Sequence, residues 1–192
     1  HAINSIMMRE KRHALDFGMS LSTAEVASTF MEDFVLQELL KTADDEMKLS
    51  ILMTKLNDDI SAISRQVAAY KFEQDLHAAY AETGYVSQAE IGKIFRKNME
   101  AYMGEAVSQD PGSENWWVYW NHFRTFFYVY SYASGLLISK SLQNSVKNDP
   151  KFIEKVKEFL AAGYSDSPKN IFAKMDVDIT DKKFWLNGMD EV

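Results

Sequence analysis

A histidine and a glutamate near the start of the sequence have the spacing of a metal site. His1 is followed 24 residues later by Glu25, in a stretch that also carries Glu32. An imidazole nitrogen and a carboxylate oxygen are both zinc ligands, and they could reach one ion from two neighbouring helices. A helix capping box made by Ser22 and Glu25 explains the same glutamate without a metal. Both readings stay open at this point.

A second group of residues could act on a developing negative charge. His122 and three nearby tyrosines, Tyr128, Tyr130 and Tyr132, carry N–H and O–H donors that could stabilise an oxyanion. The alternative is structural: a histidine satisfied at a helix start beneath the tryptophans of 116–120, and tyrosines that pack in a core. Core packing fits Tyr132 better than the other two.

Composition excludes several classes of protein. The 192 residues carry a net charge of −7 and no basic block, which argues against nucleic-acid binding. There is no cysteine, so a disulfide scaffold and cysteine-based zinc or nucleophile chemistry are excluded. The longest uncharged run, 125–139, is shorter than the roughly 20 residues of a membrane span. With no secretory signal visible, we expect a cytoplasmic protein that binds no membrane.

Helical periodicity runs through the whole chain and predicts an all-α fold. The most regular stretch is 44–82, where apolar residues recur every three or four positions. Ser87 and Glu90 form a predicted capping box, and Gly84 is a predicted helix end. Pro150 and Pro168 each follow a capping residue, as prolines at the first helical position do. The expected helices are 2–13, 22–42, 44–82, 88–104, 123–147, 150–163 and 168–175, with a last turn or two in 181–188.

The sequence also suggests how the helices are organised. We expect residues 1–192 to form the C-terminal part of one catalytic domain, with a zinc-helix remnant (1–42), a helical body (43–147) and C-terminal helices (148–192). The chain begins at a histidine rather than a methionine, so we interpret it as a piece of a longer polypeptide. Its oligomeric state cannot be read from the sequence.

Several short motifs occur in the order found in a known family. They are His1 with Thr23–Phe30, Arg65-Gln66, Phe72-Glu73, Glu82-Thr83-Gly84, Tyr102-Met103-Gly104, His122-Phe123, Phe127–Gly135, Phe159–Gly163, Ser167-Pro168 and Val177-Asp178-Ile179. With these motifs the chain resembles the C-terminal part of oligoendopeptidase F, a relative of thimet oligopeptidase. The likeness covers nearly the whole chain.

The resemblance implies a zinc metallo-endopeptidase that hydrolyses short, unfolded peptides in a helical channel. His1 would be the second histidine of the family's His-Glu-x-x-His motif, and Glu25 the third protein ligand of one zinc ion. Glu32 would orient a ligand from behind. His122 would be the substrate-binding histidine that stabilises the oxyanion. Tyr130 is the first choice for its tyrosine partner and Tyr128 the second.

Two departures from the family pattern affect this interpretation. The family's first histidine and catalytic glutamate do not occur in this sequence, so we expect the chain to be inactive by itself. The glycine-rich loop that carries one active-site tyrosine in thimet oligopeptidase is replaced here by Arg124-Thr125-Phe126-Phe127, which leaves the tyrosine assignment open. Two rival functions also stay open: a non-catalytic helical interaction module, and a degenerate relative that binds peptide or zinc without turnover.

Overall fold

Helices form all of the regular structure in the described part of the chain. The computed structural model describes the backbone of residues 1–192 and every side chain except that of Ser22. Its α-helices are α1 (Ala2–Lys11), α2 (Val26–Thr42), α3 (Asp45–Ile60), α4 (Gln66–Thr83), α5 (Gln88–Met103), α6 (Tyr130–Asn148), α7 (Ile153–Leu160), α8 (Pro168–Ala173) and α9 (Lys182–Asp190). The all-α prediction is confirmed. Among these residues, no helix combines the length and apolar character that crossing a membrane requires.

The chain packs as two units. The first consists of His1–Asp59 and Ser134–Val192, and the second of Ile60–Ala133. Each unit has its own cluster of buried apolar side chains. The assignment of the three stretches 1–42, 43–147 and 148–192 to one catalytic domain stays a prediction.

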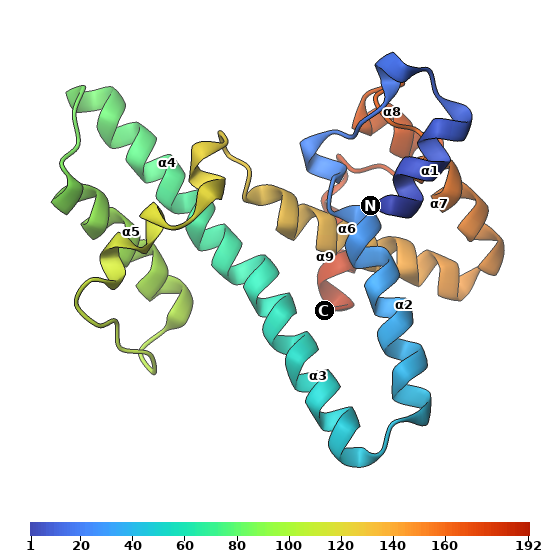
Figure 1. Cartoon of the computed structure of the whole chain (residues 1–192), viewed down its shortest axis with the longest axis horizontal. Coiled ribbons are helices and arrows are strands. Elements are labelled where there is room, and N and C mark those ends of the chain that lie inside the picture. Colours follow the sequence, from blue (N-terminus) through green and yellow to red (C-terminus); the bar gives the residue numbers. More distant parts are fainter. The chain divides into compact units, whose positions relative to one another are not determined.

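In the first unit, α1 lies beside α7 (Figure 1). The buried Asn4 side chain donates a hydrogen bond to the Leu160 carbonyl. Arg12 Nε donates to the Ala161 carbonyl at 2.8 Å. The last carbonyls of a helix have no partner within it, so these two donors satisfy the end of α7. The core beneath is built from Val26, Ala27, Phe30, Ile138, Leu142, Val156, Phe159, Leu160, Ala162, Ile171, Phe172 and Met175.

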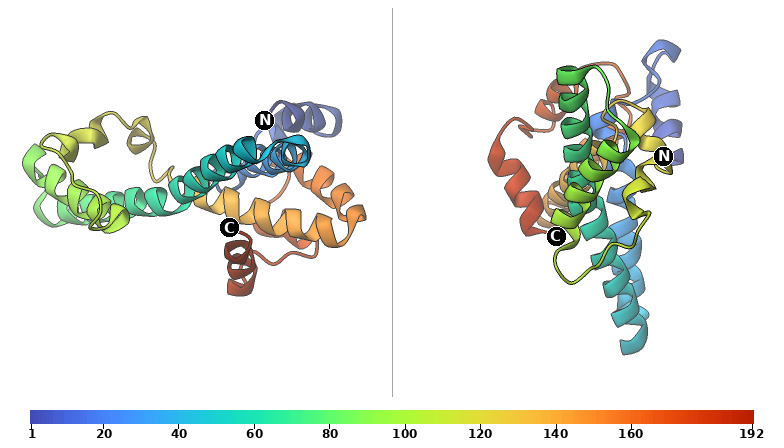
Figure 2. Two further views of the ribbon diagram at one scale, coloured as in Figure 1. Left: turned by 90° about the horizontal axis from the view of Figure 1, so that it is seen from below. Right: turned by 90° about the vertical axis from the view of Figure 1, so that its left-hand side faces the viewer.

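In the second unit, α5 packs alongside α4 (Figure 2). Phe72 of α4 meets the rings of Phe95 and Phe123 edge-on, at centroid distances of 5.2 and 5.0 Å. Edge-to-face geometry is favourable for aromatic pairs. The core of this unit consists of Ala68, Ala69, Phe72, Phe95, Met99 and Val129. It supports the segment that carries His122 and the tyrosines.

Helix ends set by local hydrogen bonding lie where the sequence predicts them. Ser87 Oγ accepts the Glu90 amide at 3.3 Å, and Glu90 Oε2 accepts the Ser87 amide at 2.8 Å, which confirms the capping box. Gly84 follows α4 with φ 71°, the left-handed conformation that glycine adopts without steric cost. Pro150 and Pro168 both lie at the start of a helical turn.

The long helical stretch predicted at 44–82 forms with one interruption. A π-helical turn at Ser61–Arg65 separates α3 from α4. Most of the apolar stripe on α3 is exposed; its members include Leu49, Leu52 and Leu56, with 62%, 51% and 48% of their surface accessible. Periodicity identifies the apolar face of a helix but not what covers that face. The predicted helix is therefore confirmed, but its burial along α3 is not.

Two predicted helix starts are wrong. The helix expected from 123 begins as a short 3₁₀ turn, Asn121–Arg124, and α6 starts only at Tyr130. Phe127 lies between them with φ 49°, which no right-handed helix allows. The helix expected from 22 begins as the 3₁₀ turn Leu21–Thr23, and α2 starts at Val26 with Glu25 at its cap position. The proposed capping-box partner, the Ser22 side chain, lies outside the described residues.

Candidate functional site

The structure brings His1 and Glu25 together. His1 lies at the cap position of α1 and Glu25 at that of α2. The His1 Nε2 and Glu25 Oε2 atoms are 3.7 Å apart. The His1 side chain is 62% exposed, whereas the Glu25 side chain is only 16% exposed. A largely buried carboxylate therefore lies next to an accessible imidazole, although the two residues are 24 positions apart in the sequence.

The surroundings of Glu25 restrict the position of its carboxylate. Ser28 Oγ donates to Glu25 Oε2 at 3.1 Å from the first turn of α2. On the other side lies Gly135 of α6, where a Cβ atom would come within 2.7 Å of the Glu25 Cβ. Glycine is thus the residue that lets α6 approach this closely. Glu25 is thus held by Ser28 at its carboxylate and packed against Gly135 at its backbone and Cβ.

The pair fits part of a zinc site. Two ligand atoms on one tetrahedral zinc, each about 2.0–2.1 Å from it, are separated by about 3.4 Å, close to the observed distance between His1 Nε2 and Glu25 Oε2. One nitrogen and one carboxylate oxygen also suit the metal chemically. In the described part of the chain, no group of three or more histidine, aspartate or glutamate side chains comes together. His1 and Glu25 would therefore be two ligands of an incomplete set.

Glu32 and its neighbour Asp33 have opposite environments. Glu32, the predicted orienting carboxylate, is exposed on α2, and its role stays a prediction. Asp33 is buried with 7% of its surface accessible. Its carboxylate contacts Lys140 Nζ of α6 at 2.5 Å and Lys55 Nζ of α3 at 2.9 Å. Asp33 is not among the residues predicted from the sequence; its position three residues after Phe30, on the apolar stripe of the helix, was the available signal.

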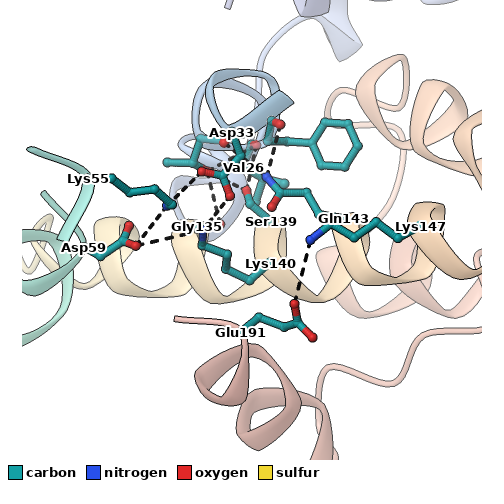
Figure 3. Close-up of polar contacts among 12 residues, drawn as sticks. Val26, Asp33, Lys55, Asp59, Gly135, Ser139, Lys140, Gln143, Lys147 and Glu191 are labelled. Carbon is teal, nitrogen blue, oxygen red and sulfur yellow. Dashed lines mark hydrogen bonds and ion pairs between the residues drawn. The ribbon is translucent and has the colours of Figure 1, made fainter. Parts of the chain in front are cut away.

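Asp33 belongs to a buried network of alternating charges (Figure 3). Lys55 also contacts Asp59 at 3.0 Å, and Lys140 lies 3.9 Å from the same carboxylate. Burial opposes the charge on Asp33, but hydrogen bonds from Lys140 and Lys55 outweigh it and hold the pKa of Asp33 below its ordinary value. The network ties α2 to α3 and α6 within the first unit.

Polar and small residues on one face of α6 complete its contact with α2. Gly135, Ser139 and Gln143 recur every four positions and so share a face. Ser139 Oγ donates to the Val26 carbonyl at 2.9 Å, and Gln143 Nε2 donates to the Phe30 carbonyl at 3.2 Å (Figure 3). These bonds fix the register of α6 against the helix that begins beside Glu25.

In the second unit, His122 is paired with a tyrosine. His122 Nε2 and the Tyr132 hydroxyl are 2.8 Å apart, within hydrogen-bond distance. The His122 ring also lies 5.3 Å from the Tyr128 ring. Tyr128 and Tyr132 are themselves in contact, with ring centroids 5.8 Å apart. His122, Tyr128 and Tyr132 thus form one cluster, which we call the His122 cluster.

Tyr130, the first-choice tyrosine of the sequence analysis, has other neighbours. Its ring meets Tyr70 edge-on at 6.5 Å, and 37% of its surface is exposed. The tyrosine that the sequence assigned to the core, Tyr132, is the one bonded to His122. Helical spacing gave no signal for this cluster, because Tyr128 precedes the start of α6 at Tyr130. A catalytic role for Tyr130 stays a prediction.

Comparison with known proteins identifies related sequences over nearly the whole chain. The sequence model of peptidase family M3 matches residues 1–191. Group B oligopeptidase PepB of Streptococcus agalactiae serotype III (strain NEM316) is 30% identical over 182 residues, which are 94% of this chain and 30% of that protein. The plasmid-encoded oligoendopeptidase F of Lactococcus lactis subsp. cremoris is 29% identical over 185 residues, 93% of this chain and 30% of its own length.

A solved structure shares the same fold. The crystal structure of oligoendopeptidase-F from Enterococcus faecium superposes with a TM-score of 0.78 at 26% identity, and the match covers 99% of this chain and 34% of that one. The chain therefore spans about 30% of the length of the curated relatives it matches.

Proposed function

The chain belongs to peptidase family M3 and is oligoendopeptidase F-like, and we propose that it forms the C-terminal part of a zinc-dependent endopeptidase that hydrolyses short peptides. Family M3 depends on zinc, and the curated relatives are named as oligopeptidases. The activity is proposed for the full-length polypeptide. The 192 residues alone are expected to be inactive, since the general base and one histidine ligand are not among them.

The observation that carries this proposal is the pairing of His1 with Glu25. Their ligand atoms approach to 3.7 Å from the starts of two helices. In the full-length protein these two side chains would hold the metal together with a histidine that precedes His1. Glu32, on the same helix, would orient one of the zinc ligands from behind. When bound, zinc supplies a Lewis acid that polarises the peptide carbonyl and lowers the pKa of water.

The His122 cluster would donate hydrogen bonds to the bound peptide substrate. An imidazole N–H and a phenolic O–H can both donate hydrogen bonds to the oxygen that gains charge as the peptide carbonyl is attacked. The hydrogen bond between His122 and Tyr132 fixes the orientation of the imidazole ring. Tyr128 shares the cluster, and Tyr130 is the further candidate donor. We propose that His122 and one of these tyrosines stabilise the oxyanion.

The test is cleavage of a fluorescence-quenched short peptide by the full-length protein, with and without a zinc chelator. We expect chelator-sensitive cleavage that added zinc restores. Glu25→Ala should lose bound zinc and activity while helical content is retained. The matched control is Glu38→Ala, because Glu38 lies on the same helix, is exposed and pairs only with Lys41 among the described ion pairs.

A zinc-replete, fully active Glu25→Ala protein would overturn the proposal. Absence of both cleavage and zinc from the purified full-length protein would favour the non-catalytic interaction module. Zinc or peptide binding without turnover would instead identify a degenerate relative. The residues that precede His1 separate these outcomes independently, since a peptidase requires His-Glu-x-x there.

A further inference from the structure

Glu73 is a buried carboxylate for which the proposed function gives no role. It lies on α4 with 3% of its surface exposed. Within the described part of the chain, its Oε2 atom has no hydrogen-bond partner. Its Oε1 atom accepts the backbone N–H of Phe127 at 3.2 Å. A buried acid with one backbone partner calls for an explanation, because burying it is costly.

The partner of Glu73 has an unusual backbone conformation. Phe127 has φ 49°, in the left-handed region that residues with a side chain rarely occupy. Its ring packs against Tyr70 at 5.3 Å and against His77 at 5.2 Å. The left-handed residue is thus held at two points, by aromatic packing on its side chain and by Glu73 on its amide.

The conformation of Phe127 determines the direction of the residues that follow it. Tyr128 comes next, and its amide bonds to the Thr125 carbonyl at 3.1 Å. The Ser131 amide then bonds to the Tyr128 carbonyl at 3.1 Å as α6 begins. Through this turn the chain delivers the Tyr128 ring to His122. Changing φ at Phe127 would redirect both Tyr128 and the start of α6.

We propose that Glu73 is a positioning residue for the His122 cluster: by accepting the Phe127 amide it holds the left-handed turn that places Tyr128 against His122. This inference rests on the proposed function, in which that cluster binds the oxyanion. The role needs an acceptor oxygen rather than a negative charge. Burial raises the pKa of Glu73, with the Phe127 hydrogen bond acting in the opposite direction, and a protonated carboxyl still accepts through its carbonyl oxygen.

Two substitutions in the full-length protein separate the acceptor from the charge. Glu73→Gln keeps an amide oxygen that can accept the Phe127 N–H, whereas Glu73→Leu removes the acceptor. We expect Glu73→Leu to lower kcat by roughly 10- to 100-fold, with little change in KM or zinc content, since the misplaced groups act on the oxyanion. Glu73→Gln should retain most of kcat. Glu82→Leu, on the exposed end of the same helix, is the matched control and should be unaffected.

Amide hydrogen exchange of the 125–131 segment provides a second readout, which in the wild-type and Glu73→Gln proteins does not depend on how the leucine variant folds. We expect the Phe127 amide to be protected in the wild-type protein and in Glu73→Gln, and to exchange much faster in Glu73→Leu. An unprotected Phe127 amide in the wild-type protein would overturn the proposal. So would a Glu73→Gln protein as inactive as Glu73→Leu. If the wild-type protein is a zinc peptidase and Glu73→Leu keeps its kcat, the positioning role fails while the proposed function stands.

Discussion

Gly135 of α6 lies against Glu25 so closely that a Cβ on the glycine would come within 2.7 Å of the Glu25 Cβ and 3.1 Å of its carbonyl carbon. The contact joins the candidate zinc ligand to a helix more than 100 residues away in sequence. The nearest atoms belong to Glu25 itself, two of them backbone atoms, so they cannot move aside as the end of a flexible side chain can. The position of Glu25 therefore depends on the absence of a side chain at 135.

The first prediction concerns this contact. Gly135→Ala should destabilise the protein by about 1–3 kcal/mol through overpacking, even though alanine favours a helix more than glycine does. In the full-length protein it should also weaken zinc binding, because Glu25 must shift. Unfolding in urea and zinc content measure the two effects. Gly92→Ala is the control: Gly92 also lies within a helix, but its nearest neighbour is the flexible Glu114 side chain at 3.1 Å. Equal stability of the two variants would contradict the prediction.

The second prediction concerns the ion pair of Asp33 and Lys140. Removing one partner leaves the other charge buried with a single shared partner, at 2.9 Å for Asp33 (Lys55) and 3.9 Å for Lys140 (Asp59). Asp33→Leu or Lys140→Met alone should therefore cost up to about 3 kcal/mol, the lower end for a broken buried pair. The double variant should recover most of this loss, since Lys55 keeps Asp59 as a partner at 3.0 Å. Urea unfolding of the two single variants and the double variant gives the coupling energy. Single variants that each cost less than about 1 kcal/mol would show that the pair is effectively solvated.

The third prediction distinguishes the tyrosines. Tyr132→Phe removes the hydroxyl that bonds His122 Nε2, so the imidazole loses its orientation. We expect kcat of the full-length protein to fall by roughly tenfold or more, as when a supporting hydrogen bond is removed. Tyr128→Phe and Tyr130→Phe test the two direct donors in parallel. Of these two variants, the one with the larger loss of kcat identifies the oxyanion donor. A Tyr132→Phe protein with unchanged kcat would show that Tyr132 has no role in the site.

The fourth prediction concerns the pH dependence of stability. The pKa of Glu73 is raised in the folded protein, mainly because burial disfavours the charged form. The folded state therefore binds the proton more tightly than the unfolded state does. This contribution to stability is fully present below the unfolded-state pKa of about 4.3 and is lost as the pH rises through the higher folded-state pKa.

Glu73→Gln cannot lose this proton, so it serves as the reference. We expect the free energy of unfolding of Glu73→Gln minus that of the wild-type protein to increase from acid toward neutral pH. Any pH-independent cost of the new amide shifts this difference by the same amount at every pH, so its slope against pH is unchanged. Urea unfolding at a series of pH values measures the difference, and a flat difference would mean that Glu73 titrates normally.

Local chemistry allowed much of the fold to be predicted. Gly84 ends α4 and Ser87 caps α5 because each acts on backbone groups a few residues away. Pro168 starts α8 for the same reason. The motifs also predicted the family and its zinc dependence, and the family is confirmed by the match over residues 1–191. The roles of His1, Glu25 and His122 stay predictions, with geometry that supports them.

The tertiary structure decided what depends on distant neighbours. Glu32 and Asp33 are adjacent acids, but in the folded chain only Asp33 is buried against Lys140 and Lys55. Likewise, the sequence predicts a helix from residue 123, but aromatic contacts and the Glu73 carboxylate hold Phe127 in a left-handed turn instead. Helix caps and periodicity depend on residues within a few turns, so a sequence determines them by itself. Which polar group becomes buried, and which tyrosine meets His122, depends on contacts between segments that only folding brings together.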